Sequence, residues 1–280
     1  MKSIIAMCTF AGLATSAAVA TPIDTLSAGQ IANGPVAVQN TQTSFGGNNF
    51  LGAAYYEVDG GNLNLMFVGR LGNGNERLAV FFDVAPGGAN VLPGGQFGLN
   101  NTGMRFDAAF TADHSIVINV GGTTMFIDRN TYDAGGNLAS SAFEGSNPAA
   151  NGGGVLFGSG LRASVNNLGY AGPFGFGLLN GGDIAGILGN NAGIGLSVPL
   201  ALLGVNVGDI IRISAMILGG DGATMSTQVL GGVNGGIGGY PNSSQIDFNQ
   251  IEGNQYFTIP APGAAAFVGL GLIAAGRRRR

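Results

Sequence analysis

The stretch LGAAYYEVDGGNLNLMFVGRLGNGNERLAVFFDV, residues 51–84, decides the fold class. It contains three runs, 51–59, 62–70 and 76–84, that are separated by glycine-rich pairs or loops. In the second and third runs, every second residue is apolar: Leu63, Leu65 and Phe67, then Leu78, Val80 and Phe82. A period of two residues predicts β-strands that place one face against a core. The separators, Gly60-Gly61 and LGNGN (71–75), tolerate positive φ angles, so we expect a hairpin at each.

The same pattern continues along the chain and predicts about ten or eleven strands with almost no helix. Further strands are expected at 104–112, 114–121, 122–129, 161–167, 194–198, 209–217, 246–253 and 254–259. Loops are expected at 85–103, 130–160 and 219–244. Pro199 and Gly204 bracket one helical turn, because proline suits the start of a helix and glycine its end. Strands at this spacing favour an all-β, antiparallel β-sandwich.

Both ends of the chain differ from this middle part. Lys2, an apolar run and Ala18-Val19-Ala20 have the order of a secretory signal peptide, with Ala18 and Ala20 at the cleavage site. We therefore divide the chain into a signal peptide (1–20), a loosely structured N-terminal segment (21–50), a β-sandwich domain (51–258) and a C-terminal sorting or anchor segment (259–280).

The C-terminal segment reads IPAPGAAAFVGLGLIAAGRRRR. Its uncharged part, 263–276, would span ~21 Å as a helix, which is short against a hydrocarbon core of ~30 Å. A terminal arginine cluster stays on the cytoplasmic side of a membrane. We expect a short or transient insertion; a permanent anchor and an amphipathic helix are the alternatives, and the segment lacks the polar face that the latter needs.

This order of proline motif, apolar helix and arginines resembles the PEP-CTERM sorting signal of exopolysaccharide-producing bacteria. The residues that carry the resemblance are Pro260, Ala261, Pro262, Arg277, Arg278, Arg279 and Arg280. Alanine stands where the usual signal has glutamate, as in the Pro-Ala-Pro variant of planctomycete-type proteins. The resemblance implies export, the inner membrane as the site of the C-terminal helix before processing, and an exosortase-type enzyme that cuts at the proline motif.

The middle of the chain carries a second resemblance. RLAVFFDVAPGGANVLPG (77–94) and IGLSVPLALLGVNVGDIIRISAMI (194–217) are similar to segments of DOMON-like and family-nine carbohydrate-binding-like sandwiches. MRFDAAFTADHS (104–115) and STQVLGG (226–232) resemble recurring blocks of exported planctomycete-type proteins. The resemblance implies a jelly-roll-like sandwich that binds sugars or haem, and it does not imply catalysis.

Charge and composition exclude several functions. Without the two terminal segments, six arginines remain against all 15 acidic residues, a net charge of −9 with no lysine. Such a surface repels phosphates, so we expect no nucleic acid partner. The only cysteine, Cys8, lies in the signal peptide, and His114 is the only histidine. A catalytic triad or a zinc site therefore lacks its usual residues. Haem ligation by His114 with Met104 or Met125 is an alternative to an ordinary strand-edge histidine.

Three further sets of residues are candidates for a site. Asp83, Asp107 and Asp113 lie near strand ends, where turn capping explains them better than the paired carboxylates of glycoside hydrolysis. Asp128, Asn130 and Asp133 offer oxygen ligands for calcium, although their spacing departs from an EF-hand. Tyr55 and Tyr56 are adjacent in a strand and could contact a glycan, with ordinary sheet packing as the alternative.

The sequence predicts an exported, surface-associated protein without catalytic residues. Its expected role is structural or adhesive, within the cell envelope or the extracellular polysaccharide matrix. A carbohydrate-binding module, with or without calcium, is the alternative, and an exported glycoside hydrolase is a more distant one. No cofactor is expected apart from calcium in that alternative. The expected partners are the processing enzyme and the polysaccharide or other envelope components.

Overall fold

The structure is a computed structural model, and it describes residues 34–39, 49–147, 155–167, 193–205, 209–233 and 242–260. The predicted signal peptide and the tail after Pro260 lie outside these residues. Within them the chain is all-β and forms two antiparallel sheets, as the sequence predicted. The helical elements of this part are three 3₁₀ turns: η1 (Leu200–Leu203), η2 (Ser243–Gln245) and η3 (Phe248–Gln250).

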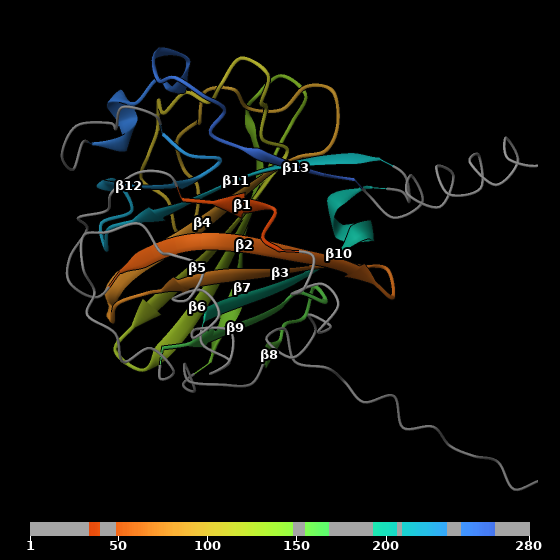
Figure 1. Cartoon of the computed structure of the whole chain (residues 1–280), viewed down its shortest axis with the longest axis vertical. Coiled ribbons are helices and arrows are strands. Elements are labelled where there is room, and N and C mark those ends of the chain that lie inside the picture. Colours follow the sequence, from red (N-terminus) through yellow and green to blue (C-terminus); the bar gives the residue numbers. More distant parts are fainter. Residues whose placement is uncertain are drawn as a thin grey trace, which may run out of the picture.

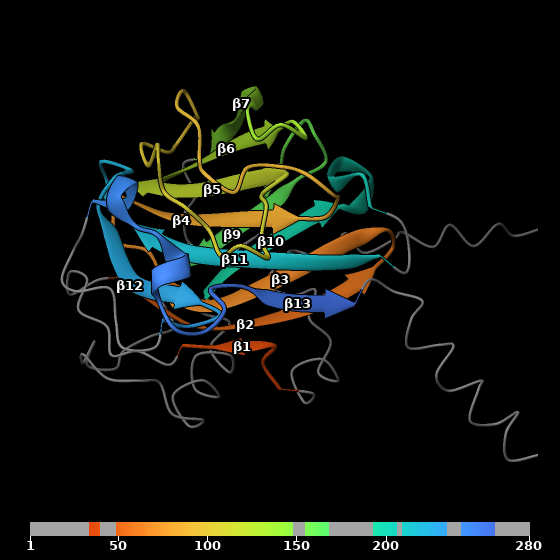
Figure 2. The ribbon, with the colours of Figure 1, turned by 90° about the horizontal axis from the view of Figure 1, so that it is seen from above.

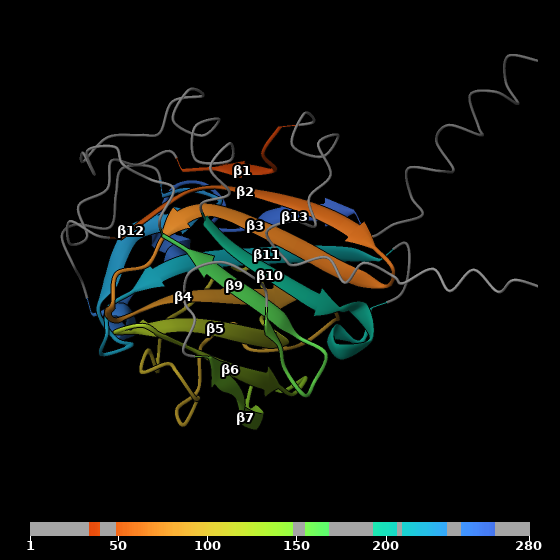
Figure 3. The same ribbon diagram turned by 90° about the horizontal axis from the view of Figure 1, so that it is seen from below.

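The two sheets face each other and make a sandwich (Figure 1). The first sheet contains, in spatial order, β1 (Ala37–Val38), β2 (Phe50–Asp59), β3 (Asn62–Arg70), β10 (Gly193–Pro199), β9 (Arg162–Asn166) and β8 (Val155–Leu156). Figure 3 shows the first five of these strands side by side. The second contains β12 (Met225–Leu230), β11 (Ile210–Leu218), β4 (Gly74–Asp83), β5 (His114–Gly121), β6 (Thr124–Tyr132) and β7 (Leu138–Asn147), and β13 (Phe257–Pro260) pairs with β11.

The alternating apolar residues of the opening stretch form the core between the sheets. The predicted inward sets of β3 and β4 are all fully buried there: Leu63, Leu65, Phe67, Leu78, Val80 and Phe82. Alternate residues of β11, such as Ile211 and Ile213, complete the same core from the neighbouring strand. The period-two prediction is confirmed because each of these strands turns one face to the facing sheet.

The two glycine-rich separators behave differently. Gly60 and Gly61 both have positive φ and join β2 to β3 in the predicted hairpin. The prediction of a second hairpin at 71–75 is wrong, because β3 pairs with β10 in the first sheet and β4 pairs with β11 in the second. The segment is instead a corner between the sheets. Leu71 is fully buried in the core there, and the Gly72 amide donates to the Asn49 side chain, so the chain folds over the core's edge.

A layer of loops covers the outer face of the second sheet. We call residues 85–113 and 242–256 the loop layer; Figure 2 shows its yellow part and blue turns over the strands. Its apolar side chains form a second buried cluster with the outward residues of β4, β5 and β11. Phe106 of the loop meets Phe81 of β4 edge to face, with ring centroids 4.9 Å apart at 67°. The second sheet is therefore buried on both faces over much of its area.

The loop layer corrects two predicted strands. Residues 104–112 make isolated bridges and a turn, in which the Phe110 amide donates to the Asp107 carbonyl over 2.9 Å. Residues 246–253 form η3 after Asp247, whose side chain accepts from the Asn249 amide. Their apolar residues alternate because they point down into the second cluster, and that packing requires no strand ladder.

Two predicted loops contain strands instead. β7 and β8 lie within 130–160, and β12 lies within 219–244. All three are at sheet edges, where β7 is largely part-exposed along its whole length. β7 has little buried area and therefore no clear apolar alternation. β12 is mostly buried, but its sequence MSTQVL has three successive polar residues, 226–228, and does not alternate either. In the segment 21–50, the described Ala37–Val38 is also paired, as β1 beside β2.

Candidate functional site

An arginine and an aspartate meet at the end of the second sheet where the loop layer stops. Arg212 of β11 and Asp83 of β4 are direct cross-strand partners. The guanidinium Nη1 lies 3.0 Å from Asp83 Oδ2; the Asp83 side chain is 6% exposed and that of Arg212 is 40% exposed. Both residues have the outward parity of their strands, so the pair projects from the face that carries the loop layer.

A pocket of about 300 Å³ opens over this ion pair. Its polar lining is Asp83, Thr111 and Arg212. Its apolar lining comes from the chain that follows β4, from the loop 108–111 and from the first residue of β11: Val84, Ala85, Pro86, Ala108, Ala109 and Ile210. Ile210 is 60% exposed, which is unusual for a large apolar side chain. The pocket thus combines a few convergent polar groups with apolar walls, as small-molecule sites do.

The polar groups of the pocket keep free hydrogen-bonding capacity. Asp83 Oδ2 accepts from Arg212 and, at 3.4 Å, from the Thr111 amide. Among the described residues, no group donates to Asp83 Oδ1, and the Thr111 hydroxyl has no partner. Burial raises the pKa of Asp83 above its ordinary value, while the hydrogen bonds from Arg212 and Thr111 act in the opposite direction. The pocket therefore presents one acceptor, one hydroxyl and a partly exposed guanidinium.

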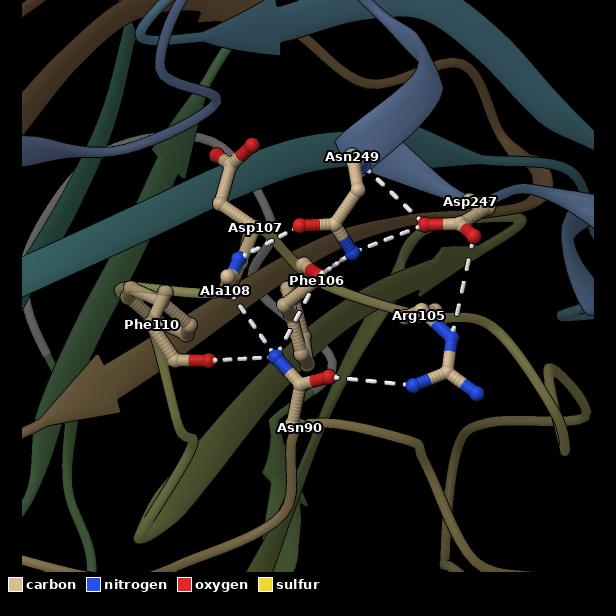
Figure 4. Close-up of polar contacts among 8 residues, drawn as sticks. All are labelled: Asn90, Arg105, Phe106, Asp107, Ala108, Phe110, Asp247 and Asn249. Carbon is tan, nitrogen blue, oxygen red and sulfur yellow. Dashed lines mark hydrogen bonds and ion pairs between the residues drawn. The ribbon is translucent and has the colours of Figure 1, made fainter.

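Two asparagines hold the loop that forms one wall of the pocket (Figure 4). Asn90 Nδ2 donates to the carbonyls of Phe106, Asp107 and Phe110, over 3.2, 2.8 and 3.0 Å. Asn249 accepts from the Ala108 amide at 2.7 Å and donates to the Phe106 carbonyl at 3.0 Å. A side-chain amide both donates and accepts, so each asparagine replaces strand neighbours that the loop lacks. The position of Ala108 and Ala109 follows from this network.

Replacing Asn90 with alanine is expected to destabilise the protein by about 2 kcal/mol, because three carbonyls lose their shared donor. The loss is measured as the shift in urea unfolding free energy. Asn62→Ala is the matched control, since Asn62 makes one exposed bond of 3.4 Å to the Gly60 carbonyl; its effect should stay within about 0.5 kcal/mol. Equal effects of the two substitutions would contradict the assigned role of Asn90.

The other two candidate carboxylates hold backbone amides. Asp113 Oδ2 accepts from the Val84 and Ala85 amides, at 2.8 and 2.9 Å, and so caps the end of β4. Asp107 Oδ2 accepts from the Gln255 amide at 2.7 Å and ties the two parts of the loop layer together. Burial raises the pKa of both groups. Both side chains thus act as turn caps, and Asp83 is the one carboxylate among the pocket's described lining residues.

The calcium candidates are bonded to protein groups. Asn130 is fully buried, and its Oδ1 accepts from the Phe97 amide and from Ser141 Oγ, at 2.8 and 2.7 Å. Asp133 Oδ1 accepts from the Gly135 and Asn137 amides, both at 2.9 Å, in the turn before β7. Asp128 lies on β6, where burial raises its pKa and the charge of Arg77 opposes that shift. Within the described residues, no group of three acidic, histidine or cysteine side chains could hold a metal ion.

The two candidate tyrosines lie on opposite faces of β2. Tyr55 is 4% exposed, and burial raises the pKa of its hydroxyl. Tyr56 is half-buried and packs against the core between the sheets. Neither contributes to the pocket over Asp83. Tyr56 thus takes part in core packing, whereas Tyr55 belongs to neither of the two described core clusters, and glycan contact by either ring stays a prediction.

His114 begins β5, opposite Phe82 of β4. Met104 belongs to the cluster under the loop layer, whereas Met125 lies in the core between the sheets, beside Val120 at the far end of β5. The three residues therefore do not converge. Burial lowers the pKa of His114 below 6.5, and the charge of Arg129 adds to this, while a hydrogen bond with the Leu203 backbone opposes it.

This lowered pKa predicts a pH dependence of stability. Below its ordinary pKa of 6.5 the unfolded chain takes up a proton that the folded His114 resists, so stability falls as the pH drops through 6.5. Urea unfolding at pH 7.5 and pH 5.5 measures the drop. His114→Gln should show a smaller drop than the wild-type chain, and an identical drop would contradict a neutral, half-buried His114.

The remaining sequence-predicted residues lie mostly outside the described part of the chain. Ala18, Ala20, Ala261, Pro262 and the arginine cluster 277–280 are all outside it. Pro260 is the last residue of β13 and pairs with Ile210, so β13 ends beside the pocket. In the described residues, no helix has the length and apolar character to cross a membrane.

The sequence arguments missed the pocket itself. Asp83 was among the sequence candidates, but its partner was not: the signal for Arg212 was a charge within the apolar run IIRISAMI. Thr111, Asn90 and Asn249 gave none, because their partners are distant in the chain. Comparison of the chain with protein-family models, curated protein sequences and solved structures found no match.

Proposed function

We propose that this chain is an exported, surface-associated protein with a structural or adhesive role in the cell envelope or extracellular polysaccharide matrix. Export is supported by the signal-peptide pattern of residues 1–20. The net charge of −9 without the terminal segments, and the absence of lysine there, support a neutral polymer over a polyanion as partner. We also propose a jelly-roll-like fold. It is supported by the paired strands β3 and β10 of the first sheet, which are each followed in the chain by one of the paired strands β4 and β11 of the second sheet.

The observation that carries a non-catalytic role is the use of the carboxylates. Asp107 and Asp113 accept hydrogen bonds from main-chain amides of the loops that they hold. Asp83 alone of these three lines the pocket, and its nearest partner is a guanidinium. Glycoside hydrolysis needs two carboxyl groups on either side of the scissile bond. The exported hydrolase therefore has less support than a binding or structural protein.

A carbohydrate-binding module is the alternative, and the pocket over Asp83 favours it. The pocket has the mixed lining that ligand sites have, at the end of a rigid sandwich. The calcium-dependent form of this alternative has weaker support, because Asn130 and Asp133 direct oxygens to protein donors. The binding experiment therefore includes a comparison with and without calcium.

The role is tested by co-sedimentation of the full chain with the extracellular polysaccharide of the producing cells. Saturable binding that survives a calcium chelator supports an adhesive role in the matrix. Binding that is lost with the chelator and restored by calcium supports the calcium-dependent module. Absence of binding in both conditions removes the polysaccharide from the proposal and leaves a protein partner in the envelope.

Processing at both ends is part of the same proposal. Mass spectrometry of the protein recovered from the cell surface should find an N-terminus at Thr21 and a C-terminus near the proline motif. Because Pro260 already belongs to β13, a cut after this residue leaves the whole described sandwich in place. A surface protein that still ends in Arg280 would contradict the sorting signal and the exosortase-type partner, and would favour the permanent anchor.

A further inference from the structure

We infer that the pocket over Asp83 and Arg212 binds one ring of a neutral sugar through two adjacent hydroxyl groups. The inference gives a site and a ligand class to the matrix role, and its biological meaning rests on that proposed function. The polar half of the pocket is the cross-strand pair together with Thr111, and the apolar half includes Pro86, Ala109 and Ile210.

Charge selects the class of ligand. Asp83 and Arg212 compensate each other at 3.0 Å, so the floor of the pocket carries no net charge. An acidic ligand at Arg212 would lie beside the Asp83 carboxylate, and a cationic ligand at Asp83 would lie beside the guanidinium, with repulsion in both cases. A neutral ligand that offers both a donor and an acceptor avoids this repulsion.

Geometry then selects adjacent hydroxyls. Asp83 Oδ1 is an acceptor without a donor among the described residues, and Arg212 uses Nη1 alone for its bond to Asp83. One hydroxyl can donate to Oδ1 while its neighbour accepts from the remaining guanidinium N–H groups. The Thr111 hydroxyl can serve a third oxygen. The C–H face of a ring would cover Ala109, Pro86 and the exposed Ile210, which removes apolar surface from water.

Size limits the ligand to a single ring. A pocket of about 300 Å³ is at the lower end of the range for ligand sites. Its wall is set by the asparagine network, because Asn249 holds the Ala108 amide and Asn90 holds the turn around it. The site is therefore pre-formed, and binding does not require ordering of the loop.

The test uses the full chain and a panel of neutral hexoses, with glucuronate as the acidic comparison, in saturation-transfer NMR titrations. Thr111→Val removes a hydroxyl and should weaken binding about three- to tenfold, the equivalent of one hydrogen bond. Ala109→Phe fills the pocket and should abolish binding. Ala139→Phe is the matched control, an exposed alanine on β7 away from the pocket, and should bind as the wild-type chain does.

The outcomes separate this site from the proposed function. Hexose binding that Ala109→Phe abolishes and Ala139→Phe spares supports the site, whether or not polysaccharide binds. Hexose binding that Ala109→Phe leaves unchanged overturns the site, and polysaccharide binding by the same variant would still support the matrix role. Absence of hexose binding, or glucuronate binding as tight as that of the best hexose, also overturns the inference.

Discussion

Replacing Phe106 with alanine is expected to release the loop layer from the second sheet at a cost of about 3–5 kcal/mol. Phe106 is 1% exposed and belongs to the cluster under the loops. Its ring lies 4.9 Å from both Phe81 and Phe110, centroid to centroid, and 6.4 Å from Phe248. Truncation would leave a cavity between the strand and both parts of the loop layer, and rigid loop connections cannot close it.

The loop layer of this variant should unfold under conditions in which the core between the sheets remains folded. The core between the sheets does not contain Phe106, so hydrogen exchange should increase in 89–112 at conditions where β3 and β10 remain protected. Urea unfolding gives the total loss. Phe97→Ala is the control from the same loop, because Phe97 is 46% exposed, and it should cost less than about 1 kcal/mol. Uniform loss of protection across both sheets would contradict a separate loop layer.

Replacing Gly88 with alanine is expected to cost about 3 kcal/mol, from an unfavourable backbone conformation and a steric clash together. Gly88 has φ +85°, and a Cβ there would lie 2.6 Å from the Ala112 carbonyl oxygen. That carbonyl accepts from the Ala89 amide at 2.8 Å, in the bridge that starts the loop layer. The backbone must therefore move apart at the point where the loop layer joins β5.

Gly60→Ala separates the two contributions. Gly60 also has a positive φ, +56°, but a Cβ there meets nothing within 4 Å. It should lose about 1 kcal/mol from the backbone conformation alone. Thermal or urea unfolding of the two variants gives the difference. A Gly88→Ala variant as stable as Gly60→Ala would show that the backbone of the Ala89–Ala112 bridge can move away from the new Cβ without loss of stability.

The central strands were predictable because their residues meet the same environment along the whole strand. Leu63, Leu65 and Phe67 repeat every second residue since β3 faces the other sheet throughout. The edge strand β7 gave no such pattern. It is part-exposed on both faces, so small residues such as Ser, Ala and Gly can occupy either face. At 104–112 a strand was predicted where the structure has a loop. The apolar pattern arises there because Phe106 and Phe110 are buried in the cluster beneath that loop.

The candidate site also has features that the sequence could suggest and features that required the tertiary structure. The turn preference of aspartate suggested a capping role for Asp113, but the Val84 and Ala85 amides that it holds lie 29 and 28 positions away, so the tertiary structure supplied these partners. The pairing of Asp83 with Arg212 joins residues 129 positions apart, so it required the register of β4 against β11. The wall of the pocket required Asn249 to reach Ala108 across 141 positions.

Short-range information in the chain thus specifies strand periodicity and the turn at Gly60-Gly61, and it predicts the signal-peptide and sorting-signal patterns of the two termini. These features depend on neighbours within a few residues, where backbone preferences and side-chain alternation act. The tertiary structure alone decides that 71–75 is a corner, that a glycine-rich loop becomes a third layer, and that Asp83, Thr111 and Arg212 share a pocket. Those outcomes depend on contacts between distant segments, which no local pattern encodes.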